Sequence, residues 1–591
     1  MTTTTAVRQL QQQILPPGMP STTVWGYGSV NHPGSFNYPS FTIEAKQDAP
    51  VRVKWINQLV DGNGNYLPHL LPVDPTLHWA NPPGGEMGRD MSPEFLSTPG
   101  PYTGPVPIVT HVHGAHTYDH SDGFAEAWYL PEARNVPSGF ASVGSKYDGF
   151  KAAFEAAWGQ AWTPGSSVFQ YPNDQAATTL WYHDHALGMT RLNVYAGPAG
   201  FYLLRGGRTD VESGVLPGPA PAPGDLPGTR YYEIPIAIQD RSFNGDGSLF
   251  YPDSREFFDE FGGPYIPESD ISPIFNPEFF GNTTVVNGNT WPYLTVEPRR
   301  YRFRLLNGCN SRFLILKMVD NPTAQRPASA MLPFWQIGAE GGFLPKPVQL
   351  NQLIMGLAER ADVVVDFTGL RPGTEIFLIN EGPDEPFGGL GGPSADPDTT
   401  GQVMKFVVGP LLSTDTSVPP AQRQLPVLAG LGAASITRKL SLNEADSEVL
   451  EDVGPREAEL GTVDANNMPV EKGWHDPITE NPSVGATEVW ELYNFTADAH
   501  PIHVHQVQFQ VVSRQQLETD EEGMAMKPAV LIPGTNRGPE SWETGYKDTV
   551  IAYPGEVTRI KAKFDIPGLF VWHCHIVEHE DNEMMRPYRV G

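Results

Sequence analysis

Ten of the sixteen histidines lie in four short clusters, HVH at 111–113, HDH at 183–185, HPIHVH at 500–505 and HCHIVEH at 573–579. Random placement of sixteen histidines along 591 residues would put fewer than one in these windows. A single buried histidine is most often a hydrogen-bonded core residue, but that explanation does not account for such a concentration. Imidazole is a very common metal ligand in proteins, so the clusters predict metal chemistry.

Each cluster contains the spacing His-x-His. In an extended strand the side chains of residues i and i+2 point to one face, and the side chain between them points to the other. Each pair therefore offers two imidazoles on one face, and four pairs offer eight nitrogen ligands. Three metal ions can share eight such ligands and keep positions open for dioxygen. The pairs are His111 with His113, His183 with His185, His503 with His505, and His573 with His575.

The cysteine between the last pair is expected to serve a separate metal ion. Cys574 must point away from His573 and His575, because it alternates with them along the strand. A soft thiolate, two imidazoles and a weak axial thioether define a blue-copper electron-transfer site. His579 and Met584 follow Cys574 at the spacing of a ligand loop, and His500, just before the strand of His503, can supply the second imidazole. Zinc is the competing metal, but this donor set favours redox copper.

The elements that must position these residues occur three times along the chain. VRVKWINQL (51–59), YRFRLLNGC (301–309) and EVWELYNFT (488–496) each predict a strand that ends at an asparagine. The longer segments 166–185, 361–380 and 556–575 each predict two strands joined by a turn. Three copies of so long a unit indicate three similar β domains. The middle copy has Ile379 and Asn380 where the outer copies have histidine, so we expect it to be structural.

Two proline-rich segments, 207–229 and 410–434, are predicted linkers because they lack strand periodicity. They divide the chain into predicted domains at residues 1–206, 230–409 and 435–591. The content of 60 glycines and 59 prolines is typical of short strands joined by turns. The segment 147–162 predicts a short helix inserted in the first domain.

The net charge of −29 argues against binding to nucleic acid or to anionic membranes, because both are polyanions. No run of about 18 apolar residues is present, so we expect no membrane-spanning helix. The first residues lack a basic start followed by an apolar run, so we expect no secretory signal. Only Cys309 and Cys574 are present, and a metal-bound Cys574 would leave no intrachain disulfide. The sequence predicts no particular oligomeric state.

The chain resembles the bacterial multicopper oxidases, and most closely their branch of spore-coat laccases and phenoxazinone synthases. The shared segments are THVHG with SDGFAEAWY, LWYHDHALGMTRLNVYAG, WPYLTVEPRRYRFRLLN, HPIHVH and HCHIVEHEDNEMMRP. The likeness begins near residue 25, keeps one order and continues to the end of the chain. It implies an all-β fold of three cupredoxin-like domains, each a Greek-key β-sandwich or barrel. It also implies four copper ions, with a type 1 copper in the third domain and a trinuclear cluster between the first and third domains.

The resemblance assigns a role to each matching residue. The type 1 ligands would be His500, Cys574, His579 and Met584, and the type 2 ligands would be His111 and His503. The pair of type 3 ions would be bound by His113, His183, His185, His505, His573 and His575. Asp122 and Glu580 match acidic residues that the family places near the dioxygen channel, where a carboxylate can relay protons. The alternative for Asp122 is a turn-stabilising role, and for Glu580 a hydrogen bond to a ligand histidine.

The implied activity is that of a laccase-like multicopper oxidase. Its partners would be dioxygen and a small aromatic reducing substrate, which would dock near His579 or His500, where the ring edges are expected to reach solvent. Cys574 would pass each electron on to His573 or His575. The alternatives are a metal oxidase acting on Cu(I), Mn(II) or Fe(II), a bilirubin oxidase, or a copper carrier without turnover. The resemblance also suggests a cytoplasmic or spore-coat-like location in a bacterium.

Overall fold

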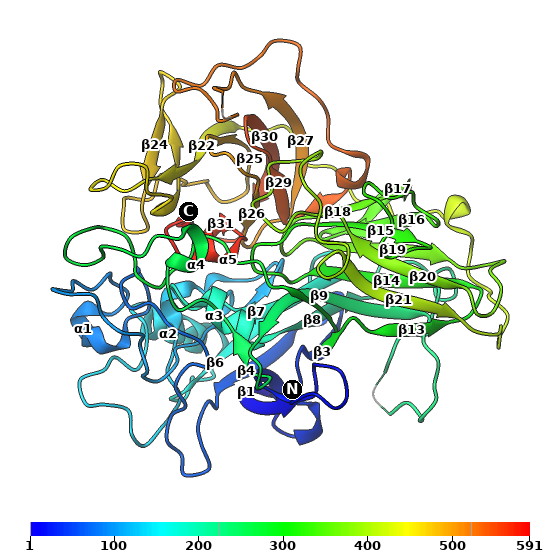
Figure 1. The fold of residues 1–591 in the computed structure, drawn as a ribbon, viewed down its shortest axis with the longest axis horizontal. Helices are drawn as coiled ribbons and strands as arrows, with labels where there is room; N and C mark the ends of the chain where they lie inside the picture. The colour runs from blue at the N-terminus through cyan, green and yellow to red at the C-terminus, as the bar shows by residue number, and fades with distance from the viewer. Residues whose placement is uncertain (1, 223, 522) are drawn as a thin grey trace.

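The computed structural model describes residues 2–222, 224–521 and 523–591, and these form six β-sheets with few helices (Figure 1). The first pair of sheets lies in the N-terminal part of the chain, which we call the first unit. One sheet has the strand order β2 (Thr22–Ser29), β1 (Thr2–Gln12), β4 (Val51–Asn57), β6 (Ser166–Tyr171). The other has the order β3 (Ser40–Lys46), β8 (Ala199–Arg205), β7 (Thr178–Asp184), β5 (Thr110–His113).

The second unit contains the two sheets formed by the middle of the chain. The first has the order β12 (Asn289–Thr290), β11 (Thr283–Val286), β9 (Glu233–Phe243), β14 (Arg300–Asn307), β19 (Arg360–Asp366), β16 (Phe334–Ala339), β17 (Gly342–Leu350), and β10 (Leu249–Phe250) pairs with β9. The second has the order β13 (Tyr293–Val296), β21 (Gln402–Val408), β20 (Glu375–Asn380), β15 (Leu314–Val319), β18 (Leu353–Met355).

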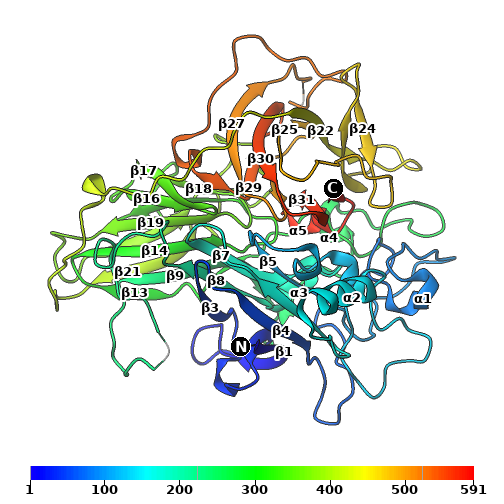
Figure 2. The same cartoon turned by 180° about the vertical axis from the view of Figure 1, so that it is seen from behind.

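The third unit contains the remaining two sheets, and Figure 2 shows it above the first and second units. Its larger sheet has the order β24 (Pro469–Lys472), β23 (Glu457–Val463), β22 (Ile436–Ala445), β25 (Ala486–Asn494), β30 (Glu556–Phe564), β27 (Phe509–Gln516), β28 (Tyr546–Lys547). Its smaller sheet has the order β29 (Thr549–Ala552), β26 (His500–Val504), β31 (Gly568–Cys574), β32 (Met585–Val590). The all-β prediction is therefore confirmed.

The predicted threefold repeat is visible in the pairing of equivalent strands. β4, β14 and β25 each pair in parallel with an early strand of their unit, namely β1, β9 and β22. Each also pairs antiparallel with the first strand of the longer repeat, namely β6, β19 and β30. Each ends at a buried asparagine whose amide donates to two backbone carbonyls, and these residues are Asn57, Asn307 and Asn494. The same kind of buried asparagine hydrogen bonding thus occurs at the end of the equivalent strand in each unit.

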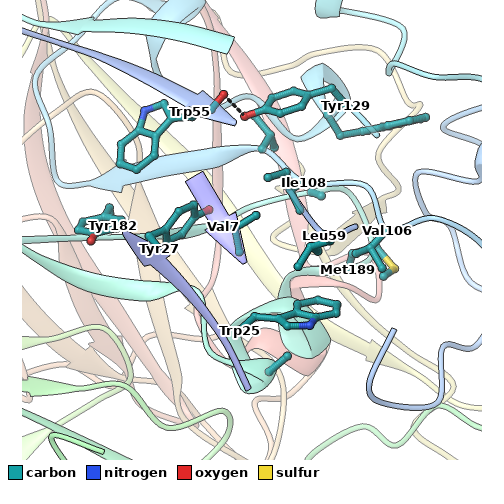
Figure 3. Packing of buried hydrophobic residues seen from close by; sticks show 14 of the residues in the cluster. Val7, Trp25, Tyr27, Trp55, Leu59, Val106, Ile108, Tyr129, Tyr182 and Met189 are labelled. Carbon is teal, nitrogen blue, oxygen red and sulfur yellow. Dashed lines mark hydrogen bonds between the residues drawn. The ribbon is translucent and has the colours of Figure 1, made fainter. Parts of the chain in front are cut away.

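Buried aromatic side chains fill the space between the two sheets of the first unit (Figure 3). Trp25, Trp55 and Tyr182 are completely buried there. The Tyr129 hydroxyl donates to the Trp55 carbonyl over 3.2 Å, so its polar end is satisfied as well. Burial of each such ring contributes on the order of 2 kcal/mol, which makes this core a rigid support for the strands beside it.

Short helices join the strands, and they are α1 (Gly85–Gly88), α2 (Tyr147–Trp158), α3 (Thr190–Ala196), α4 (Glu256–Asp259) and α5 (Val577–Glu580). The predicted helix at 147–162 is present as α2, but it ends earlier because Gly159 adopts a left-handed conformation. No helix among the described residues is long and apolar enough to cross a membrane. The predicted linkers contain only one short 3-10 turn, Pro420–Gln422, within their described residues. The domain division at 1–206, 230–409 and 435–591 remains our proposal.

Candidate metal centres

The four His-x-His pairs come from two pairs of neighbouring antiparallel strands. In the first unit β5 lies beside β7, with His111 opposite His183. In the third unit β26 lies beside β31, with His503 opposite His573. The second histidine of three pairs lies one residue beyond its strand, and His500 lies inside β26 and not before it as predicted. The reason is that His500 itself pairs with Ala552 of β29, which extends the strand.

These strands bring all eight imidazoles together where the first and third units meet. Every one of them is buried, with at most 2% of its surface exposed. They form triples whose ligand atoms lie within 4.8 Å of one another. One triple is His113, His183 and His575, a second is His185, His505 and His573, and His111 and His503 form a third together with His505.

The hydrogen bonds of the rings leave one nitrogen free on most of them. The Nδ1 atoms of His111, His183 and His503 donate to the backbone oxygens of Asp122, Asp184 and Asp548, over 2.5, 2.8 and 2.7 Å. The Nε2 atoms of the same three rings have no hydrogen-bond partner. In metal sites the bond made by one ring nitrogen sets which nitrogen remains free to bind the metal. These three rings are therefore held with Nε2 free to bind a metal ion.

His113 is oriented in the opposite way. Its Nε2 lies 3.1 Å from Asp548 Oδ1 and 3.0 Å from Thr549 Oγ1, while its Nδ1 has no partner. Burial, and then the neighbouring His503, hold the pKa of His113 well below its usual range, so the ring is neutral. Burial together with neighbouring imidazoles also lowers the pKa of His183 to about 3. Neutral rings with unpartnered buried nitrogens are a suitable donor set for metal ions and are otherwise costly to bury.

Both predicted carboxylates lie against this cluster. Asp122 Oδ2 accepts a hydrogen bond from His505 Nδ1 over 2.8 Å, and its Oδ1 has no partner. Burial raises the pKa of Asp122 well above its usual range. Glu580 lies 3.2 Å from His573 Nδ1 and 3.5 Å from His185 Nε2. Burial acts to raise the pKa of Glu580, but His573 and His185 outweigh it and the pKa is lowered. The two carboxyls therefore differ in proton affinity although both contact the cluster.

The sulfur site predicted around Cys574 is also assembled. Cys574 Sγ lies 3.6 Å from His500 Nδ1 and 3.9 Å from His579 Nδ1, and the two nitrogens are 3.3 Å apart. A point equidistant from these three atoms is about 2.1 Å from each, which is close to the usual metal–nitrogen distance of about 2.0–2.1 Å and the usual metal–sulfur distance of about 2.3 Å. Met584 is fully buried in the same hydrophobic cluster, and its backbone oxygen accepts a hydrogen bond from Cys574 N over 3.0 Å. Cys574, His500 and His579 thus fit a single metal ion, and Met584 packs in the same cluster.

A cavity of about 720 Å³ reaches the Cys574 site, and His579 forms part of its wall. His500 is fully buried, so the prediction that its ring edge reaches solvent is wrong, whereas His579 keeps 2% of its surface exposed and lines the cavity. His500 is enclosed because its Nε2 is bonded to Thr496 Oγ1 over 2.7 Å. The loop from Phe387 to Pro393, rich in glycine, forms another wall of the cavity. Access to the sulfur site is therefore through His579.

Three carboxyl groups that were not predicted lie at this cavity beside the two imidazoles. Glu278 Oε1 is 3.8 Å from His579 Nε2, and Asp498 Oδ1 is 3.5 Å from His500 Nε2. Glu444 of β22 also lines the cavity. Burial, and then Asp498, raise the pKa of Glu278 and of Glu444 well above the usual range. Glu278 is only 4% exposed and shares a side-chain hydrogen bond with Asp498. No sequence motif joins these residues, so only the fold reveals them.

A Cys-His-His-Met site that is one peptide bond away from an eight-histidine cluster, on three β units, defines a blue-copper oxidase. The comparisons agree with this class. A multicopper oxidase family model matches residues 452–591. A laccase of Bacillus stratosphericus is 36% identical over 96% of this chain and 91% of its own length. A laccase of Haloferax volcanii is 34% identical over 99% of this chain and 80% of its own.

The fold is shared with solved structures as well. The crystal structure of the McoA multicopper oxidase from Aquifex aeolicus has a TM-score of 0.62 and 22% identity, covering 100% of this chain and 96% of that one. The chain belongs to the multicopper oxidase family. It is accordingly a copper oxidoreductase that uses dioxygen, and the family implies one type 1, one type 2 and two type 3 copper ions. The donor atoms described above fit that set of ions.

His116 links the first and third units outside the metal cluster. Its Nδ1 is 2.8 Å from Asp174 Oδ1 and its Nε2 is 3.0 Å from Asp565 Oδ1. Burial lowers its pKa, but the bonds to Asp174 and Asp565 outweigh burial and raise the pKa of His116 to about 9. The bridge therefore stabilises the fold fully below the ordinary histidine pKa, near 6.5, and is lost as pH rises through about 9.

We expect His116→Gln to lower the free energy of unfolding by about 1 kcal/mol near pH 6 and by much less near pH 10, since the two carboxylates are partly exposed. Denaturant titrations at the two pH values measure the difference. His32→Gln, at an exposed position, is the matched control. An equal loss at both pH values would show that the charge on His116 does not stabilise the fold.

Proposed function

We propose that the protein is a laccase-type oxidase that takes one electron at a time from a small aromatic donor bound in the cavity beside His579. The observation that carries this proposal is the cavity of about 720 Å³ whose wall includes a ligand of the sulfur site. Ligand pockets for small organic molecules have volumes of about 300 to 1,000 Å³. Phe387, Leu390 and several prolines supply apolar contact area for an aromatic ring.

We assign the ligand roles from the groups of ligand atoms that lie close to one another. We assign type 1 to His500, Cys574, His579 and Met584, and type 2 to His111 and His503. We assign one type 3 ion to His113, His183 and His575, and the other to His185, His505 and His573. When bound, copper supplies one-electron redox chemistry and the reduction of dioxygen. The chain itself contributes a covalent route, because Cys574 is bonded directly to His573 and His575.

Dioxygen uptake by the copper-loaded protein tests this proposal. With 2,6-dimethoxyphenol as donor, four donor molecules should be oxidised for each dioxygen consumed, without release of peroxide. A copper carrier without turnover would bleach once on addition of the phenol and consume no dioxygen. Peroxide as the main product would also contradict the proposal.

Glu580 is the group that we propose delivers protons to the cluster. Its carboxyl lies against two rings of the His185–His505–His573 triple, 3.2 Å from His573 Nδ1 and 3.5 Å from His185 Nε2, and is buried. Asp122, whose raised pKa favours the protonated form, is the second proposed proton carrier.

We expect Glu580→Gln to slow turnover by about 10²-fold or more, the usual contribution of a positioned acid, while copper content stays normal. Stopped-flow reoxidation of the reduced protein, together with copper analysis, measures both. Glu578→Gln is the matched control, since Glu578 is equally buried on α5 but bonds to Tyr251, Asn310 and Ser311. Normal reoxidation of the Glu580 variant would remove that carboxyl from the proton route.

A second candidate donor is an oxidisable metal cation such as Fe(II), Mn(II) or Cu(I). The observation that favours it is the group of Glu278, Glu444 and Asp498 beside the type 1 imidazoles. No lysine or arginine in the described part of the chain forms an ion pair with any of the three. Burial and Asp498 raise the pKa of Glu278 and Glu444, so these carboxyls hold protons when no cation is bound. A cation bound within reach of His579 would replace those protons.

If a cation is the donor, Glu278→Gln should lower kcat/KM for Fe(II) by about tenfold to a hundredfold, as expected for loss of a charged ligand. The same variant should change kcat/KM for 2,6-dimethoxyphenol by less than about twofold. Glu385→Gln is the control, because Glu385 is exposed at the same cavity. Equal losses for both donors would exclude a dedicated cation site at Glu278.

A further inference from the structure

Arg360 lies where the three units of the chain meet. It is the first residue of β19 in the second unit and is only 2% exposed. Its Nε donates over 3.0 Å to the backbone oxygen of Thr179 in β7, the strand that carries His183. Its two terminal nitrogens both bond to the carboxylate of Asp548 in the third unit, with Nη1 3.0 Å from Oδ1. One guanidinium thus joins all three units.

Asp548 in turn contacts two histidines of the cluster. Its Oδ1 is 3.1 Å from His113 Nε2, and its backbone oxygen accepts from His503 Nδ1 over 2.7 Å. The rings of His113 and His503 are stacked, with centroids 3.6 Å apart. This one residue therefore contacts a histidine of the first unit through its carboxylate and a histidine of the third unit through its backbone.

The carboxylate also sets which nitrogen His113 presents, together with the Thr549 hydroxyl, which lies 3.0 Å from His113 Nε2 and itself donates to Asp548 Oδ1. An acceptor at Nε2 keeps the hydrogen on that atom, and Nδ1, which has no partner, remains available to a metal. His183, in the same triple, presents Nε2 instead, because its Nδ1 is bonded to the backbone oxygen of Asp184. His113 therefore depends on a side chain, where His183 depends only on the backbone.

The planar fork of arginine is suited to fix a carboxylate plane, and lysine cannot replace that geometry. The other buried cation nearby, Lys547, forms its ion pairs with Glu340 and Glu359 instead. Gly114, directly after His113, has φ of +85°, and a Cβ there would lie 2.1 Å from Asp548 Oδ2 and 2.9 Å from Arg360 Nη2. The backbone next to His113 thus leaves just enough room for this pair of side chains.

We propose that Arg360 is a positioning residue through which the second unit, which has no predicted copper ligand, prepares the trinuclear site. It holds the Asp548 carboxylate so that His113 is fixed with Nδ1 toward His183 and His575. The second unit is then more than a spacer between the units that carry the ligands. Arg360 would act on metal binding and not on the electron donor. Failure of this proposal would therefore leave the proposed site for the electron donor unaffected.

The test compares Arg360→Lys with Arg304→Lys in the full-length protein. Arg304 of β14 is equally buried and also joins the second unit to Thr179, but it bonds to Glu233 and not to Asp548. Each variant is loaded with copper and titrated with a chelator, and the blue absorption of the Cys574 site reports that the protein is folded. Arg360→Lys should weaken binding of the most easily removed copper by about tenfold to a hundredfold, and Arg304→Lys should not.

A second measurement does not depend on copper. Nitrogen NMR of histidine-labelled, metal-free protein should show the Nε2–H form of His113 in the parent and a mixture of both forms in Arg360→Lys. Asp548→Asn alone should reproduce that mixture, and adding Arg360→Lys to it should have no further effect. Equal copper loss in the two arginine variants, or an unchanged His113 ring form in Arg360→Lys, would overturn the proposal.

Discussion

Replacing Cys574 by serine should abolish the blue absorption and the donor-driven uptake of dioxygen together. The thiolate is the soft ligand on which the colour depends, and a serine hydroxyl is a much poorer ligand for copper in this setting. Cys574 Sγ is also the atom that faces His500 and His579, at 3.6 and 3.9 Å. We expect one fewer copper ion per protein and turnover reduced to background, measured by optical absorption, metal analysis and an oxygen electrode.

Cys309→Ser is the matched control for this change. Cys309 is the only other cysteine, and it is buried in the core of the second unit with Sγ 3.8 Å from the Ile238 carbonyl. The control should lower stability modestly and keep colour and turnover. Persistence of the blue band in Cys574→Ser would place the type 1 copper elsewhere.

The alternation of side chains along a strand explains why so much of the ligand set could be predicted from sequence. His573 and Cys574 are adjacent residues that serve opposite faces of β31, and the structure places them in two different groups of ligand atoms. Such local geometry depends only on an extended backbone, which the β-branched and aromatic residues of 568–574 already favour. The three strands that end at a buried asparagine were predictable for the same reason.

Residues that act through long-range contacts could not be predicted in this way. Arg360 and Asp548 are 188 positions apart, and Glu278 meets the third unit only after the units have packed together. No periodicity relates such residues, because their proximity results from the packing of whole sheets. The burial of His500 was missed for a similar reason, since Thr496 encloses its ring through a turn that precedes the strand.

Replacing His113 by alanine should separate the two halves of the reaction. The Cys574 site has no ligand in common with the triple of His113, His183 and His575, so the blue band should remain. The cluster, in contrast, loses one nitrogen of that triple, and we expect dioxygen reduction to fall to background while the donor still reduces the type 1 site. The result is read by adding 2,6-dimethoxyphenol without air, which should bleach the colour in both proteins, and then admitting air.

On admission of air the parent should regain its colour within the time of a few turnovers, and His113→Ala should stay bleached. His120→Ala is the control, because His120 is buried in the same unit but bonds to Ser121 and to no member of the cluster. Recovery of colour by His113→Ala at the parent rate would show that dioxygen is reduced without that ring. Since the bleaching step tests the donor side and the recovery step tests the dioxygen side, one trace locates the defect in either half of the path.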